Sequence, residues 1–299
     1  MYAVLGASGH TGDVVARNLL AHGQKVRVVG RSADRLQQFV SEGAEIAIAD
    51  ATNAPALTRA FKGADSAYVL VPPNPADNDY RAFQGRVSDA IAAAVKKARI
   101  KNVVALSSFG ADKPSGNGPV DGLHNLEQKL NAIEGLNVLY LRAGYFMENT
   151  LPQTHAIRAF GTLAAPLRPD LKLPVIATRD IGAAAAEALF RRDFQGKQTR
   201  ELQGQRDLTY LEMAAIIGEA IGMPALGYIQ VSDEQFRSAL VQMGMSANLA
   251  GLILEMVGAL NSGHMKALEP RSDANTTPTS FETFVAETFM PAFQRQQAA

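Results

Sequence analysis

The chain has no cysteine among its 299 residues. This absence excludes disulfide bonds, thiolate nucleophiles and metal sites with sulfur ligands. The five histidines are scattered, without the paired spacing of a metal site and without a His-Glu-x-x-His pattern. The sequence therefore predicts no metal site.

An excess of charge of either sign is also missing. Basic and acidic residues balance at 29 each, and no basic run interrupts the chain. Nucleic-acid binding normally requires a basic patch or stripe that releases counterions. The charge balance predicts no nucleic-acid partner and favours a small-molecule ligand.

No apolar run is long enough to span a bilayer. The longest, residues 249–260, is interrupted by Glu255. We expect a buried helix there, or equally an interface helix of a homo-oligomer, and no membrane insertion. The first expected strand begins near Tyr2, which leaves no room for a cleavable leader and predicts a cytoplasmic protein.

The residues that are present suit a globular α/β protein, since 47% of them are hydrophobic. Apolar runs alternate with helical patterns through the first half, as in stacked βαβ units. The expected parallel strands cover residues 3–5, 25–29, 45–49, 66–71, 102–107 and 137–141. The expected helices cover residues 11–21, 33–42, 54–61, 79–97 and 123–132. We predict a doubly wound Rossmann sheet with strand order 3-2-1-4-5-6.

The alternation breaks down after Tyr145, where proline-bearing loops begin. Helices are expected at 180–191, 209–221, 234–243, 247–260 and 281–290, and strands at 200–203 and 227–231. Asp180 is expected to be an N-cap. The predicted organisation is a Rossmann domain over residues 1–150, with returning segments near 175–195, and a smaller, mostly helical substrate domain over 151–299.

A turn with three regularly spaced glycines follows the first expected strand and leads into the first expected helix. Backbone amides and a helix N-terminus in this arrangement bind pyrophosphate. The alternative is a connecting turn without a ligand. The predicted cofactor-binding residues of the turn are Gly6, Ser8, Gly9, His10, Thr11 and Gly12.

Arg31 follows the second expected strand, where an NAD-preferring site would carry an acidic residue. A guanidinium group suits the 2′-phosphate of NADP(H), because its planar fork pairs with phosphate oxygens. Arg35 is a candidate for a second contact. Solvated arginines on a surface helix are the alternative reading for both.

The ends of the third, fourth and fifth strands supply further cofactor candidates. Asp50 is a candidate for the adenine edge, with a helix N-cap or a turn as the alternative. Pro72 is placed by the nicotinamide ribose, or in a rigid loop without a ligand. Ser107 and Phe109 are expected beside the nicotinamide, and Ser108 beside the substrate; an ordinary strand-end turn and core packing are the alternatives.

Six segments together resemble the NmrA-like family, an atypical branch of the short-chain dehydrogenases. They are residues 6–12, 30–32, 107–110, 141–149, 179–182 and 208–214. The family includes NAD(P)H:quinone oxidoreductases, triphenylmethane-dye reductases, isoflavone-reductase-like enzymes and NADP-sensing regulators. The resemblance implies the Rossmann fold and NADP(H), and says little about the substrate.

The Tyr-x-x-x-Lys pair of most short-chain dehydrogenases is missing, since none of the seven tyrosines has a lysine four residues later. His124 lies where quinone-reductase-like members of the family also carry histidine. It is predicted to be catalytic, together with Tyr145; a histidine bonded to a neighbouring loop is the alternative. Phe146 and Asn149 are expected to line the substrate cleft, where an aromatic face can stack on a planar acceptor.

The missing pair indicates what kind of acceptor is reduced. A ketone becomes a strongly basic alkoxide that needs a positioned acid, whereas a quinone becomes a delocalised anion that a weak acid can protonate. We predict an NADPH-dependent reductase of a planar, electron-poor acceptor, a quinone. The alternative is a non-catalytic NADP(H) sensor that acts through a protein partner.

Overall fold

The computed structural model describes residues 1–295, and its centre is a sheet of seven parallel strands. Their order is β10-β6-β5-β4-β1-β2-β3, which confirms the predicted order of the first six strands and adds a seventh at the β6 edge. The strands are β1 (Tyr2–Leu5), β2 (Val26–Gly30), β3 (Glu45–Ile48), β4 (Ser66–Val69), β5 (Asn102–Ser108), β6 (Asn137–Ala143) and β10 (Lys197–Leu202).

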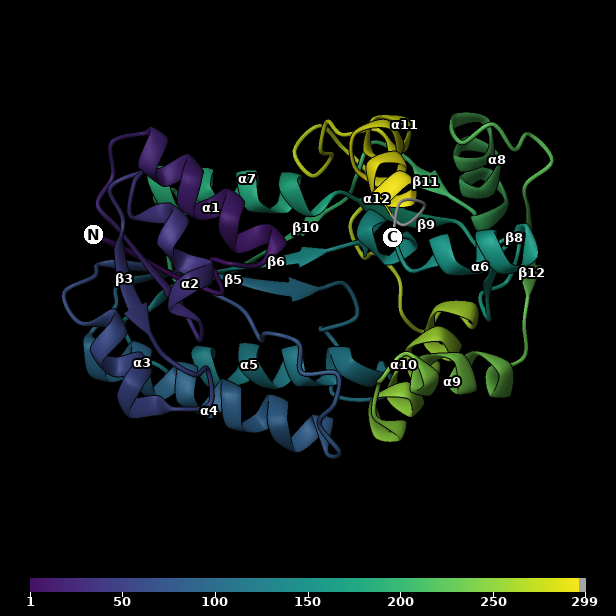
Figure 1. Ribbon diagram of the computed structural model, residues 1–299. Coiled ribbons are helices and arrows are strands. Elements are labelled where there is room, and N and C mark those ends of the chain that lie inside the picture. The colour runs from purple at the N-terminus through teal and green to yellow at the C-terminus, as the bar shows by residue number, and fades with distance from the viewer. Residues whose placement is uncertain (296–299) are drawn as a thin grey trace.

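Helices cover both faces of this sheet. In Figure 1, α1, α2 and α7 lie over one face, and α3, α4 and α5 over the other. Their bounds are α1 (His10–Ala21), α2 (Ala33–Leu36), α3 (Ala54–Phe61), α4 (Tyr80–Ala98), α5 (Asp121–Asn131) and α7 (Thr178–Arg191). The central strands are fully buried between these layers, which is why they are apolar at almost every position. The predicted α/β Rossmann class is confirmed.

The strand expected at 200–203 in the smaller domain belongs instead to the main sheet, as β10. It pairs with β6 along its whole length, from Lys197 opposite Val138 to Leu202 opposite Ala143. Its first half is exposed because it is an edge strand, so its polar sequence did not predict membership of a buried parallel sheet.

The remaining segments form a second part at the right of Figure 1. Its helices are α6 (Gln153–Phe160), α8 (Tyr210–Ala220), α9 (Asp233–Gln242), α10 (Ala247–Asn261), α11 (Phe281–Phe284) and α12 (Met290–Arg295), with a π-helical stretch over Val285–Phe289. Two small sheets combine β7 (Tyr145–Phe146), β9 (Leu173–Ile176) and β11 (Asp207–Leu208), and β8 (Thr162–Ala165) with β12 (Gly227–Gln230). Four of these five strands were not predicted, because strands of two to four residues show too little periodicity.

Helix α7 returns to the Rossmann part and packs closely against α1. A Cβ at Gly182 would lie 2.6 Å from the Cβ of Val14, so only glycine permits this approach. The prediction that Asp180 caps this helix is wrong, because the N-cap is Ala177. The Asp180 carboxylate instead accepts hydrogen bonds from the backbone amide (2.9 Å) and the hydroxyl (2.7 Å) of Thr279.

Helix α10 covers the predicted apolar segment and is buried against both parts of the molecule. Leu249 and Leu252 pack in the core between the sheet and α4, and Val257 and Leu260 pack in the core of the second part. Within residues 1–295, no helix combines the length and apolar character that crossing a membrane requires.

Candidate active site

The glycine turn between β1 and α1 is a tight, hydrogen-bonded loop. Gly6 has a positive φ of 73°, and its carbonyl accepts a hydrogen bond from the amide of Gly9 at 2.9 Å. A Cβ at Gly12 would lie 2.3 Å from the Gly6 carbonyl oxygen, so a larger residue at this position would open the turn. The N-cap of α1 is Gly9, which has no side chain to bond the first amides of the helix, so these amides suit an anion.

The side chain of Thr11 points into the core. It is 5% exposed, and its hydroxyl oxygen accepts a hydrogen bond from the Tyr68 phenol at 2.9 Å. A cofactor contact from Thr11 would therefore come from its backbone. Ser8, Gly9 and His10 instead line a cavity of about 400 Å³.

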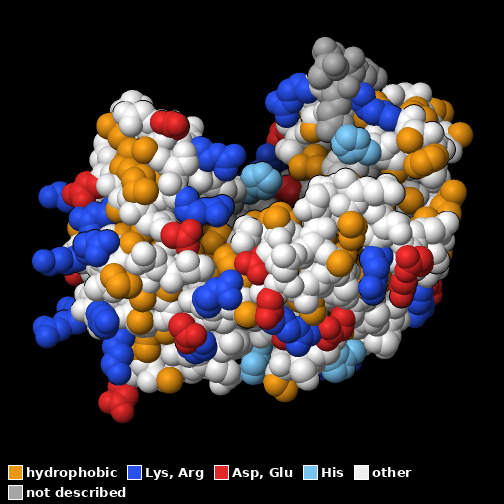
Figure 2. Space-filling view, turned by 60° about the horizontal axis from the view of Figure 1, so that its bottom comes forward, with side chains coloured by type: hydrophobic (Ala, Val, Ile, Leu, Met, Phe, Trp, Pro, Cys, Tyr) orange, Lys and Arg blue, Asp and Glu red, His pale blue; other side chains and the backbone are white. Residues whose placement is uncertain are grey.

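This first cavity lies between the glycine turn, the start of α7 and the second part of the molecule, which contributes Phe284 and Thr288. The opposite wall includes Thr178, Arg179 and Glu148, whose carboxylate accepts a 2.5 Å hydrogen bond from the Thr178 hydroxyl. Figure 2 shows the surface hollowed between its left and right parts, with a histidine side chain inside the hollow and Lys or Arg side chains near its rim.

Arg31 and Asp50 follow β2 and β3 and lie near each other. Asp50 accepts hydrogen bonds from the hydroxyl (2.6 Å) and the amide (2.8 Å) of Thr52. It therefore forms a turn, one of the two alternatives to a contact with adenine. These bonds, with a contribution from the Arg31 charge, hold the pKa of Asp50 below its usual value. The cap of the next helix is Asn53. Arg31 is exposed.

A second cavity, of about 360 Å³, lies over the carboxyl ends of β4, β5 and β6. Ligands of doubly wound sheets bind at this edge. Ser107, Ser108, Phe109, Tyr145, Phe146 and Asn149 all line it, so the structure brings six predicted site residues together. The other walls are mainly apolar, and include Leu70, Val71, Leu123, Met256, Leu260 and Met265.

Ser107 belongs to a buried network behind this cavity. Its hydroxyl donates to the Glu127 carboxylate at 2.6 Å, and the Arg142 guanidinium donates to both oxygens of the same carboxylate at 3.0 and 2.6 Å. Burial alone would lower the pKa of Arg142, but its hydrogen bond and attraction to Glu127 outweigh this and raise it. Because a carboxylate only accepts, the Ser107 proton is not available to a ligand.

The hydroxyl proton of Ser108 is also bonded within the protein. Its hydroxyl donates to the backbone carbonyl of Phe109 at 3.0 Å, which leaves only oxygen lone pairs for the cavity. Phe109 itself is 3% exposed and packs in the core of the second part.

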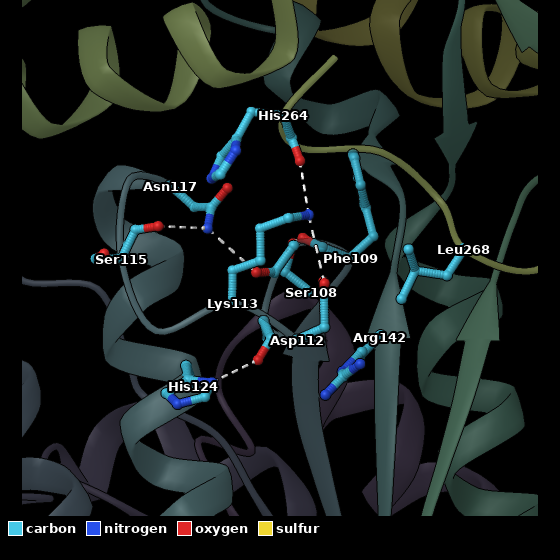
Figure 3. A network of polar contacts seen from close by, with 12 residues as sticks. Ser108, Phe109, Asp112, Lys113, Ser115, Asn117, His124, Arg142, His264 and Leu268 are labelled. Atoms are coloured by element: carbon cyan, nitrogen blue, oxygen red, sulfur yellow. Dashed lines mark hydrogen bonds and ion pairs between the residues drawn. The ribbon is translucent and has the colours of Figure 1, made fainter. Parts of the chain in front are cut away.

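His124 lies on α5 and points to the loop after β5, as Figure 3 shows. Its Nδ1 is 2.8 Å from the carbonyl oxygen of Ala111, so Nδ1 carries the proton and donates it. The neighbouring Leu123 lines the cavity, whereas His124 does not. This hydrogen bond corresponds to the alternative role given to His124 above, that of a histidine bonded to a neighbouring loop. In the same view, Lys113 reaches across to the backbone carbonyl of His264, at 2.7 Å.

Tyr145 is the remaining catalytic candidate. Its hydroxyl lies 2.9 Å from that of Tyr210, and the two rings meet edge to face with centroids 6.4 Å apart. Burial raises the pKa of Tyr145, and hydrogen bonds with Tyr210 and Asn149 offset part of this rise. Tyr145 is therefore a protonated phenol at neutral pH.

Three groups around this cavity were not identified from the sequence: Gln84, Glu127 and Tyr210. Gln84 is 2% exposed, and its side-chain amide donates to the Pro119 carbonyl at 2.8 Å. Arg142 within an otherwise apolar strand was a signal for a buried partner such as Glu127. No local pattern distinguished Tyr210 or Gln84. Pro72 follows β4 but does not line the cavity, although the preceding Val71 does.

A comparison with models of protein families shows to which family this chain belongs. The model described as the NmrA-like family matches residues 2–284. The chain belongs to the NmrA-like family. The family predicted from the six motif segments is therefore confirmed.

Three named proteins are similar to this chain. An NAD(P)H azoreductase of Xenophilus azovorans is 30% identical over 258 residues, which cover 86% of each chain. The structure of an NADPH-dependent quinone oxidoreductase of Escherichia coli, complexed with NADPH, is 24% identical with a TM-score of 0.81, and the match covers 97% of this chain and 100% of that one. The transcriptional regulator NmrA, in complex with NADP, is 16% identical with a TM-score of 0.74, and the match covers 99% and 97%.

Proposed function

We propose that this protein is an NADP(H)-dependent oxidoreductase that reduces a planar, electron-poor small molecule, with quinones as the acceptor class. The observation that carries the proposal is the cavity of about 360 Å³ over the carboxyl ends of β4, β5 and β6. Its apolar and aromatic lining suits a flat, uncharged acceptor. The azoreductase relative supports a reductase of conjugated acceptors.

The residues of the chain fit the cofactor. The glycine turn and the N-terminus of α1 suit the pyrophosphate, and the exposed Arg31 suits the 2′-phosphate. When bound, NADPH supplies the hydride. The chain itself must then hold the acceptor and provide a proton.

Tyr145 is the proton donor in this proposal. Three other polar side chains that line the cavity already use a proton inside the protein: Ser107 towards Glu127, Ser108 towards Phe109 and Gln84 towards Pro119. His124 does not line the cavity, and its Nδ1 proton is bonded to Ala111. Tyr145 lines the cavity, and its phenol remains protonated because burial raises its pKa.

A phenol is a sufficient acid for a quinone. Hydride addition gives the anion of a hydroquinone, which is itself a phenolate, so its proton affinity is close to that of tyrosine. The alkoxide from a simple ketone is far more basic. The absence of Tyr-x-x-x-Lys therefore favours the quinone over the ketone.

The proposal is tested by following the loss of NADPH absorbance with a panel of quinones, azo dyes and triphenylmethane dyes. We expect steady turnover with quinones. Tight dinucleotide binding without turnover on any acceptor would favour the NADP(H) sensor, since the NmrA regulator has the same fold.

The proton donor is tested with a matched pair of variants. Tyr145→Phe removes the phenol proton and is expected to lower kcat about 100-fold, a typical contribution of a general acid. His124→Asn retains a side-chain N–H near the position of Nδ1, so the bond to Ala111 can persist and kcat should stay close to that of the wild type. If His124→Asn lowered kcat and Tyr145→Phe did not, His124 would be the proton donor.

A further inference from the structure

Tyr210 is the hydrogen-bond partner of the proposed proton donor, Tyr145. It is the first residue of α8 and is 2% exposed. A capping box holds this end of the helix: the Thr209 hydroxyl accepts from the amide of Glu212 at 3.1 Å, and the Glu212 carboxylate accepts from the amide of Thr209 at 2.7 Å. The Tyr210 ring also packs against Tyr228, with centroids 5.0 Å apart.

The direction of the hydrogen bond between the two phenols follows from their other partners. Within residues 1–295, Tyr145 is the one hydrogen-bond partner found for the Tyr210 hydroxyl. If Tyr145 donated, the Tyr210 proton would be buried without an acceptor, which costs about 1–3 kcal/mol. If Tyr210 donates, the Tyr145 proton is left for the side that faces the cavity, which Tyr145 and its other hydrogen-bond partner, Asn149, both line.

We infer that Tyr210 is a positioning residue whose hydroxyl donates to the Tyr145 oxygen and so directs the Tyr145 proton into the cavity. This inference rests on the proposed reductase function. When the acceptor takes a hydride, the O–H bond of Tyr145 breaks and its proton joins the acceptor oxygen. The Tyr210 hydrogen bond stabilises the phenolate that remains, and that phenolate regains a proton from water.

The pair consists of two uncharged phenols. The titratable groups that act on Tyr145 and Tyr210 are these two phenols themselves and the phenol of Tyr228. Burial raises the pKa of both tyrosines, so both hydroxyls keep their protons at neutral pH and one phenol must donate to the other. The Tyr228 hydroxyl donates to the carbonyls of Ala165 and Leu167 instead, at 2.7 and 2.6 Å.

A double-mutant cycle on the full chain tests the inference. Tyr210→Phe keeps the ring and removes the hydroxyl; we expect kcat to fall about 10-fold, the effect of one hydrogen bond to a charged group, while the Kd for NADPH is unchanged. Because Tyr210 acts through Tyr145, the double variant Tyr145→Phe/Tyr210→Phe should be no slower than Tyr145→Phe alone. Tyr228→Phe is the control and should retain wild-type kcat.

Unchanged kcat in Tyr210→Phe would overturn the inference, as would a double variant whose loss equals the product of the two single losses. A second measurement does not depend on turnover. The protein is labelled with ¹³C at the tyrosine ring carbon that bears the oxygen. The NMR signal of Tyr145 is the one that is missing from the spectrum of Tyr145→Phe, and its chemical shift is followed as the pH is raised. We expect Tyr145 to titrate at higher pH in Tyr210→Phe than in the wild type, because it has lost a donor.

An identical titration of Tyr145 in both proteins would contradict the donor role of Tyr210, whatever the kinetics. If no acceptor is turned over at all, the proposed function fails, and the titration still decides whether Tyr210 donates to Tyr145. The two failures are therefore distinguishable.

Discussion

At the residue scale, the chemistry of the site depends on where each hydroxyl proton points. Ser107, Ser108 and Tyr145 are similar candidates in the sequence, and all three line one cavity. The two serines donate to oxygen atoms of the protein, whereas Tyr145 has a neighbouring phenol that can donate to it. The surrounding hydrogen bonds, rather than the residue types, separate a proton donor from a structural hydroxyl.

The cofactor preference is a prediction at this same scale. Arg31→Ala should weaken NADPH binding about 10-fold or more and leave NADH binding nearly unchanged, because only NADPH carries the 2′-phosphate that the guanidinium would pair with. The measurement is the Kd of each dinucleotide by calorimetric titration. Lys96→Ala, an exposed cation in the last turn of α4, is the control for a general change in charge. Equal losses for both dinucleotides would refute the assignment of Arg31.

At the element scale, β5, α5 and β6 are joined behind the cavity by one buried carboxylate. Glu127 on α5 binds Ser107 at the end of β5 and Arg142 near the end of β6, and its side chain is 4% exposed. The backbone carbonyl of Glu127 also accepts from the Tyr140 hydroxyl at 3.0 Å. The network therefore determines how the helix that carries Leu123 and His124 sits against the two strands.

Removal of this carboxylate should destabilise the protein. Glu127→Gln leaves the Arg142 charge buried without its main partner, so we expect the free energy of unfolding to fall by about 2–3 kcal/mol, measured by urea denaturation. Asp170→Asn is the control, because the Arg168–Asp170 pair is exposed and should contribute nothing measurable. A Glu127→Gln variant as stable as Asp170→Asn would show that the network is not important for folding.

The elements themselves were largely predictable. Long apolar strands and amphipathic helices such as β5, α3 and α4 were expected within one or two residues of their bounds. The short strands β7, β8, β9 and β11 were not, because their conformation depends on pairing with segments distant in the sequence. Strand β10 was recognised as a strand, but its polar edge gave no sign of which sheet it joins.

At the scale of the whole molecule, the two parts are held together at several places outside the cavity. Helix α10 contributes to both cores, and Asp180 on α7 binds the segment before α11 through Thr279. The boundary near residue 150 stays a prediction, as does a homo-oligomer.

The contact between Asp180 and Thr279 is a test of how the second part is anchored. Asp180→Ala removes two hydrogen bonds to a buried carboxylate, and we expect stability to fall by about 2 kcal/mol and the amides around α11 to exchange faster with deuterium. Glu187→Ala, on the exposed side of α7 in a pair with Arg191, should change neither measurement. Unchanged exchange around α11 in Asp180→Ala would show that other contacts anchor this segment.

The sequence by itself determined the Rossmann class, the order of the first six strands, the glycine turn and the family. These features depend on local spacing and on apolar periodicity, which are properties of neighbouring residues. Only the tertiary structure decided which polar groups share the cavity and which partners their hydroxyls meet. Ser107 meets a carboxylate 20 positions away and Tyr145 meets a phenol 65 positions away, and a hydrogen bond depends on distance and direction that no local pattern contains.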